Sequence, residues 1–429
     1  MTAEIAILNK IGVALAADSA ITGKIADSRK PIYVSDHKIF QVSQAAPVGI
    51  LIHGKSEFMG IPIETLVKEY ITKHGDTDFK NLEGYADKFL TFLSDEVPLH
   101  VAPHIQDQSL LNTVRHVFES MNRHMRSRFF ASRTFEYGTS WDSIAEEIVD
   151  LYYRLAMSAG VALGIHDVGQ RLAHKFLRDQ LAQVRNSIFD RNVSETHSRT
   201  LDEIGHKLIS VVTDEVVRDT GSFHTGVVFA GFGSEEVFPS CVELRLENLF
   251  KGMLKYSHGK TAKISLENTV TVLPFAQSDT VNLFMRGIAD DYHGILLDSF
   301  VTATEHYTKD FMQKLPTYSK AEQDRIVQES WSMREEHGRV FREMLYAHSR
   351  NSYASEIMDV VSLLPEDQLA ELAEALIDLT SMRRKLSFDE ETVGGPTDVA
   401  VITKGDGMTW VRRKENIARD LNPNYYTRT

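Results

Sequence analysis

The chain opens with two short apolar runs that a polar pair separates. The first run covers residues 5–8, and the second covers residues 13–17 and ends at Asp18. Short apolar runs bounded by turn residues are typical of buried β-strands. Gly12 precedes the second run and gives the backbone the freedom that a tight turn needs. The pattern therefore predicts two neighbouring strands joined by a tight turn, with Asp18 directly after the second strand.

Further buried strands are predicted along the chain. Residues 48–53 form an apolar run that ends at Gly54, before a predicted helix, and residues 226–232 form another that leaves through glycines. Residues 236–243 are predicted as the antiparallel partner of that strand, and residues 269–279 resemble a strand and loop that precede a helix. Near the end of the chain, residues 399–402 and 408–413 flank Gly405-Asp406-Gly407, a sequence typical of a hairpin turn.

Helical periodicity dominates two long stretches between these strands. The first, at residues 76–221, contains three amphipathic segments around residues 110–121, 144–155 and 176–188, with apolar residues three or four apart. The second, at residues 301–361, carries dense mixed charge. We interpret both as helical insertions, with boundaries uncertain by several residues. The remaining segments, residues 2–75, 222–300 and 362–418, form the predicted core.

Composition narrows the classes of function. The 429 residues carry a net charge of -13, which argues against a general nucleic-acid-binding surface, and the apolar runs are too short to cross a bilayer. A single cysteine, Cys241, is expected to be a buried apolar residue. We expect a cytoplasmic protein with neither a nucleic-acid partner nor a membrane partner.

No cofactor or metal site is predicted. His100 and His104 are four residues apart, but Pro103 argues against the helix that would aim both at one ion. Gly231-Phe232-Gly233 lacks the third glycine and the helix of a dinucleotide site. The basic run at residues 412–414 is expected to be a solvent-exposed strand end.

The candidate chemistry lies at the start of the chain. If Met1 is removed, Thr2 carries both a hydroxyl and a free α-amine. The amine has a reference pKa near 8, so at neutral pH a fraction of it is able to take the proton of the hydroxyl. One residue then supplies nucleophile and base.

These features resemble the start of a proteasome β-subunit and of its bacterial relatives among the N-terminal-nucleophile hydrolases. Thr2, two strands and Ala17-Asp18-Ser19 follow the order of that family, and Lys38 stands in the Lys-Ile-aromatic sequence. The segment between Asp18 and Lys38 is somewhat longer than is common. Residues 391–407 resemble the closing unit of the family, where a Ser-Gly-Gly-like loop precedes a buried strand.

The resemblance implies a role for each matching residue. Lys38 would lower the pKa of the Thr2 amine, Asp18 would pair with Lys38, and the Gly54 N–H would donate to the oxyanion. Ser278 and Glu390 are weaker matches to the auxiliary residues of the family. Val393 stands where the family has a serine, unless Thr392 replaces it, so this auxiliary set is not clearly preserved.

The implied fold is α+β: a four-layer αββα sandwich with two stacked antiparallel sheets and long helical insertions. The implied function is threonine-dependent hydrolysis of an amide or peptide bond by a homo-oligomer. Two alternatives stay open. Each candidate residue taken singly has a structural explanation, such as a turn for Asp18 or a helix entry for Gly54. The whole chain could also be a catalytically inactive, proteasome-like assembly or binding scaffold.

Overall fold

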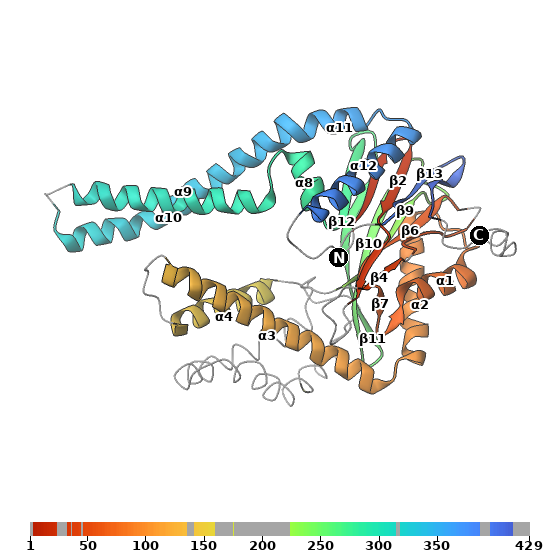
Figure 1. Ribbon diagram of the computed structural model, residues 1–429, viewed down its shortest axis with the longest axis horizontal. Helices are drawn as coiled ribbons and strands as arrows, with labels where there is room; N and C mark the ends of the chain where they lie inside the picture. The colour runs from red at the N-terminus through yellow and green to blue at the C-terminus, as the bar shows by residue number, and fades with distance from the viewer. Residues whose placement is uncertain are drawn as a thin grey trace. The chain divides into compact units, whose positions relative to one another are not determined.

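The computed structural model describes residues 3–23, 32–35, 37–43, 46–134, 141–158, 175, 224–314, 318–386 and 395–414. Figure 1 shows a mixture of long helices and β-sheets. The chain forms two compact units. The first contains residues 1–39, 237–240 and 263–429, and the second contains residues 40–236 and 241–262. The division of the chain into a core and two insertions stays a prediction.

The first unit is built on a five-stranded sheet with the order β12-β1-β2-β13-β14. All of its neighbouring strands run antiparallel. The sheet confirms the predicted opening pair of strands and the predicted closing hairpin. Its strands are β1 (Ala3–Asn9), β2 (Gly12–Ala17), β12 (Val270–Ala276), β13 (Asp398–Thr403) and β14 (Gly407–Arg412).

Gly12 is needed for a reason that the sequence did not indicate. A Cβ atom at this position would collide with the carbonyl oxygen of Ile402 on β13. Gly12 faces Thr403 in the register of the β2–β13 pair. The glycine therefore allows the close approach of a strand that lies almost four hundred residues away in sequence, in addition to its place beside the turn.

Helix α12 (Glu366–Lys385) covers one face of this sheet and contacts β1, β2 and β13. Its buried residues join the inward residues of β1, β2 and β13 in one apolar cluster. The unit also contains the hairpin of β3 (Ala20–Gly23) and β4 (Ile32–Ser35) and four further helices. These are α8 (Asp279–Arg286), α9 (Asp290–Gln313), α10 (Lys320–Ser349) and α11 (Ser355–Val361), with the π-helical turn η1 (Arg350–Ala354) between the last two.

The second unit has its own five-stranded sheet, with the order β11-β10-β9-β6-β5. Helices α1 (Ile63–His74) and α2 (Leu82–His100) supply apolar side chains to the cluster on one of its faces. The strands are β5 (Ile39–Gln41), β6 (Val48–Gly54), β9 (Thr225–Gly231), β10 (Ser240–Phe250) and β11 (Met253–Lys263). A small hairpin of β7 (Glu57–Phe58) and β8 (Ile61–Pro62) follows β6.

The start of β10 lies later than predicted. The predicted partner strand covered residues 236–243, but β10 begins at Ser240 and extends to Phe250. The carboxylate of Glu236 explains the difference, because it accepts hydrogen bonds from the backbone N–H groups of Gly233 and Leu82, at 2.8 and 3.0 Å. Glu236 thus stabilises the turn that contains Gly233 and the start of α2 at Leu82.

The described parts of both predicted insertions are helical. Helices α3 (Pro103–Thr134) and α4 (Trp141–Ser158) pack against each other, as do α9 and α10, which Figure 1 shows as a long hairpin. The apolar periodicity is confirmed at residues 110–121 and at Ile144 and Ile148, which are buried. The side chain of Leu155 and the segment at residues 176–188 lie outside the described residues. Among the described helices, none is long and apolar enough to cross a membrane.

The sequence prediction of an α+β protein with antiparallel sheets is therefore confirmed, while the stacking of the two sheets into four layers stays a prediction. His100 ends α2 and His104 lies in the first turn of α3, so Pro103 does separate the two histidines. The prediction for the basic run at residues 412–414 was wrong in part. Lys414 is buried, and its Nζ lies 3.7 Å from the carboxylate of Asp398.

Candidate active site

The pairing of β1 with β2 places Asp18 beside Ala3, the first residue of β1. The Asp18 backbone N–H donates to the Ala3 carbonyl oxygen, and its Oδ1 accepts a hydrogen bond from the Ala3 N–H, both at 3.1 Å. The register that pairs Glu4 with Ala17 fixes this position. Asp18 therefore contacts the residue that directly follows Thr2, and Thr2 itself lies outside the described residues.

The Lys38 side chain contacts Asp18, as the family resemblance implied. Its Nζ lies 2.5 Å from Asp18 Oδ1, and both side chains are buried. Lys38 lies directly before β5, twenty residues beyond Asp18, and the folding of the chain between them brings the two charges together. A buried charge of this kind is tolerated where an opposite charge and hydrogen bonds compensate it.

Glu4 completes this cluster and was missed in the sequence. Its Oε1 lies 3.1 Å from Lys38 Nζ, and its side chain is buried. The signal was present, because Glu4 is the one charged residue within the buried strand β1. The predicted strand begins at Ile5, so Glu4 was not predicted to belong to the site.

The cluster thus combines one cation with two anions. Burial alone lowers the pKa of the Lys38 ammonium, but the carboxylates of Glu4 and Asp18 outweigh it, so the pKa of Lys38 lies above its ordinary value. Lys38 stays positively charged across the neutral range. The Lys38 ammonium therefore contacts two carboxylates, whereas only the carboxylate of Asp18 was predicted.

Gly54 belongs to the second unit and ends β6 with a φ of +79°. A Cβ here would also lie 2.8 Å from the His224 carbonyl oxygen, so both the backbone angle and the space require glycine. The predicted strand-to-helix junction was wrong. The β7–β8 hairpin follows Gly54, and α1 begins only at Ile63.

Ser278 follows β12 and precedes the first residue of α8. Its carbonyl oxygen accepts a hydrogen bond from the Asn282 N–H at 2.8 Å, and its side chain makes no capping bond. Because Ala276 pairs with Ala3, Ser278 lies just beyond the edge of the sheet where β1 starts. Its catalytic role stays a prediction, and Glu390, Thr392 and Val393 lie outside the described residues.

The end of the closing loop also approaches Asp18. The Ser19 hydroxyl donates a hydrogen bond to the Pro396 carbonyl oxygen, and Asp398 pairs with Ala17 across β13 and β2. Asp398 accepts a hydrogen bond from the Lys414 N–H at 2.7 Å. Pro396 and Asp398 thus lie beside the Ala17-Asp18-Ser19 segment.

A pocket of about 520 Å³ lies beside Gly54 within the second unit. Lys55 follows Gly54 in the chain, Thr225 is its register partner, and both line the pocket. Residues of α3 also line the pocket, and other α3 residues, such as Leu110, Val114 and Phe118, are buried. The α3 residues at the pocket are His104, Ile105, Gln108, Ser109, Asn112, Thr113 and His116.

No protein-family model matches this chain, and no curated protein matches it. The chain is similar to several solved structures, among them two Anbu proteins. One is the Anbu (Gly-1) mutant from Hyphomicrobium sp. strain MC1, with 11% identity and a TM-score of 0.31 over 100% of this chain and 94% of that chain. The other is Anbu, described as an ancestral beta-subunit, from Yersinia bercovieri, with 8% identity and a TM-score of 0.27 over 99% and 94%. Likeness at TM-scores this low does not establish a shared fold.

Proposed function

We propose that the protein is a threonine-dependent amide or peptide hydrolase whose nucleophile is Thr2, freed by removal of Met1. The observation that carries the proposal is the buried position of Lys38, whose Nζ lies 2.5 Å from Asp18 and 3.1 Å from Glu4. Asp18 is in turn hydrogen-bonded to the backbone of Ala3. A folded chain rarely buries three charges beside its first strand without a use for them, because each loses its hydration.

In the proposed reaction, the Thr2 hydroxyl gives its proton to the α-amine of the same residue, and its oxygen attacks the carbonyl carbon of the substrate. The tetrahedral intermediate collapses as the α-ammonium returns a proton to the leaving amine, which departs. Thr2 then carries the acyl group as an ester. Water attacks this ester with the α-amine again as base, and the acid product and the free hydroxyl are released.

The other residues assist these steps. The Lys38 cation favours the neutral amine, and Asp18 fixes the position of that cation. The Gly54 N–H is proposed to stabilise the oxyanion, a contribution that is commonly a few kcal/mol. Glu390 is proposed as a weaker auxiliary position that helps to orient the amine and a water molecule, and Ser278 as a weaker match to the catalytic-site serine of the family.

The proposal includes a four-layer, proteasome-like arrangement of the two sheets and assembly into a homo-oligomer. The alternative is an inactive, proteasome-like scaffold, which the replacement of the family's serine by Val393 favours.

The test compares Thr2→Ala with Thr2→Ser on a library of fluorogenic peptide amides. We expect Thr2→Ala to lose about a thousandfold or more in kcat/KM, while Thr2→Ser retains measurable turnover because it keeps the hydroxyl. Intact mass should show that active protein lacks Met1. Wild-type turnover by processed Thr2→Ala, or full activity with Met1 retained, would contradict the mechanism. A folded wild type that keeps Met1 and turns over no substrate favours the scaffold.

A further inference from the structure

Two histidines and a glutamate converge on one face of the second sheet. His53 is on β6, His224 directly precedes β9, and Glu243 is on β10, so three neighbouring strands supply them. On β6 and β10, their neighbours Ile52, Val242 and Leu244 belong to the apolar cluster with α1 and α2. Because side chains alternate along a strand, His53 and Glu243 point to the face away from those helices.

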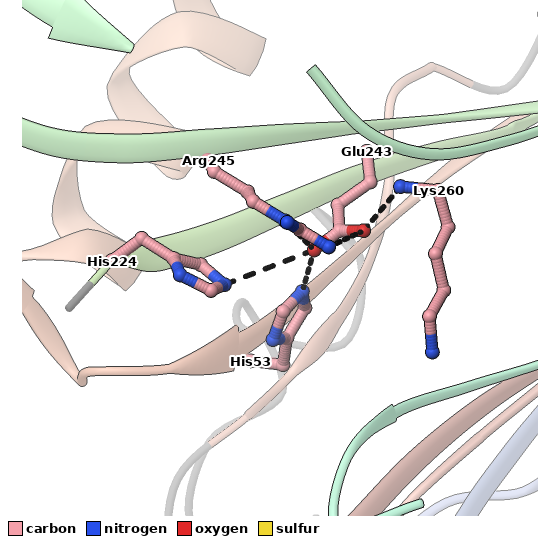
Figure 2. A network of polar contacts seen from close by, with 5 residues as sticks. All are labelled: His53, His224, Glu243, Arg245 and Lys260. Carbon is pink, nitrogen blue, oxygen red and sulfur yellow. Dashed lines mark hydrogen bonds and ion pairs between the residues drawn. The ribbon is translucent and has the colours of Figure 1, made fainter. Parts of the chain in front are cut away.

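The ligand atoms of the three side chains are close together, as Figure 2 shows. His53 Nε2 lies 3.1 Å from Glu243 Oε1, and His224 Nε2 lies 3.8 Å from the same oxygen. All three ligand atoms lie within 4.8 Å of one another. The two rings meet edge to face, with centroids 5.7 Å apart. Both imidazoles therefore present the same nitrogen to one carboxylate oxygen.

Two glycines make room for this cluster. Gly226 pairs with His53 across β6 and β9, and a Cβ on Gly226 would overlap the imidazole ring of His53. On β11, a Cβ on Gly259 would overlap the carboxylate of Glu243. Glycine at these two positions therefore leaves the space that the His53 and Glu243 side chains occupy. Glycine within a strand usually weakens it, so its presence at both positions is unusual.

The carboxylate of Glu243 is held in a fixed orientation by its neighbours. The Lys260 N–H donates to Oε2 at 2.6 Å, and Arg245 Nε donates to Oε1 at 3.0 Å. The Arg245 side chain is partly exposed.

We propose that His53, His224 and Glu243 bind a divalent transition-metal ion of the zinc class. Zinc takes imidazole nitrogen and carboxylate oxygen at about 2.0–2.2 Å, so two ligand atoms of one tetrahedral site lie roughly 3.3 Å apart. The distances of 3.1 and 3.8 Å to Glu243 Oε1 bracket that spacing. Three protein ligands leave a fourth position for water or a bound group.

The position of His224 fits coordination of an ion that it shares with Glu243. The His224 nitrogen lies beyond hydrogen-bonding distance from Glu243 Oε1, yet it points toward this oxygen. In the metal-bound form His53 coordinates through Nε2 and carries its proton on Nδ1. Lys260 N–H keeps its bond to Oε2, and the Arg245 guanidinium shifts from Oε1 toward Oε2, with which its Nη2 already makes contact at 3.4 Å.

The experiment uses the full-length protein without an affinity tag, after treatment with a chelator and buffer exchange. Zinc binding is followed by titration calorimetry, and Co²⁺ serves as a spectroscopic probe of tetrahedral coordination. We expect one ion per chain. His224→Gln should weaken binding by more than the roughly 10–100-fold that loss of an outer hydrogen-bond partner costs a metal site.

His100→Gln is the matched control, because His100 is an exposed histidine at the end of α2. It should bind the ion as the wild type does. His224→Gln leaves the His53–Glu243 hydrogen bond in place, so circular dichroism should show an intact fold. Unchanged affinity in His224→Gln, or no binding by folded wild type, would overturn the proposal. Since Thr2, Asp18 and Lys38 are not ligands, a failed metal site and a failed hydrolase are distinguishable.

Discussion

In the proposed mechanism, the charges around Lys38 set the pKa of the Thr2 α-amine. A cation near an amine lowers the amine pKa, and each nearby carboxylate raises it. Lys38 contacts Glu4 and Asp18, so the cluster has one positive and two negative charges. The pH at which Thr2 becomes active therefore depends on the balance of all three residues.

The pH profile of kcat/KM should separate these charges. The rate should rise as the Thr2 amine loses its proton, with a reference pKa of roughly 8. The raised pKa of Lys38 keeps this residue cationic throughout that range, so the rise reports the amine. Glu4→Gln removes a negative charge and should move the rise to lower pH, whereas Lys38→Met should move it to higher pH. Shifts in the same direction, or none, would reject the proposed tuning.

Asp18 should matter more for rate than for folding. In Asp18→Asn, the side-chain oxygen still accepts the hydrogen bond from the Ala3 N–H, but the charge that holds Lys38 is lost. We expect kcat to fall by about a hundredfold, near the lower end of what positioned acid–base groups contribute. Asp367→Asn, at an exposed site in α12, is the control and should leave kcat unchanged. An unaltered kcat in Asp18→Asn would remove Asp18 from the site.

At the scale of elements, α12 stabilises the sheet that holds this cluster. The helix lies on β1 and β2, the strands that carry Glu4 and precede Asp18, and on β13. Leu369, Ala373 and Leu376 are buried in the shared cluster, at the spacing of one helical face. The packing of α12 therefore fixes the geometry of the charges at the strand ends.

Leu369→Ala should reduce the free energy of unfolding by about 2–5 kcal/mol, because it leaves a cavity in that cluster. Leu379→Ala makes the same change on the same helix, at a residue that is 43% exposed. Its effect should stay near 0.5 kcal/mol, as is usual for surface positions. Chemical denaturation monitored by circular dichroism measures both values. Equal effects of the two substitutions would mean that α12 does not pack as described.

At the scale of the whole molecule, the α9–α10 hairpin carries large apolar side chains that are exposed to solvent in the single chain. Phe300 and Phe341 stack between the two helices, with ring centroids 4.5 Å apart. Tyr307 and Phe311 also stack, but both are exposed, as is Met344 on α10. Exposed apolar surface of this extent is typical of protein interfaces.

We predict that the protein forms a homo-oligomer in which this hairpin takes part. Light scattering coupled to size exclusion should give a multiple of the 48.5 kDa chain mass. The double substitution Tyr307→Ser and Phe311→Ser should shift the mass toward that of one chain, while Tyr353→Ser, at an exposed tyrosine outside the hairpin, should not. Monomer mass for the wild type at working concentrations would reject the prediction.

The sequence by itself determined the local elements and part of the site. Apolar runs placed β1, β2, β6 and the closing hairpin, because most positions of a buried strand are apolar. The resemblance of the Thr2, Asp18 and Lys38 segments to the proteasome-like pattern implied the Asp18–Lys38 contact. Helical periodicity identified α3 and α4, whose apolar faces repeat every three to four residues.

Only the tertiary structure decided which distant residues share a site. Glu4 became part of the cluster because the fold brought Lys38 to it, and a single charge in a strand gives no indication of its partner. His53, His224 and Glu243 stand in three segments with no common motif, so their convergence depends on the order β10-β9-β6 in the sheet. Gly12, Gly226 and Gly259 are each required by atoms of a neighbouring strand, which local sequence does not reveal. Local sequence sets the conformation of each strand, whereas strand pairing sets which side chains meet.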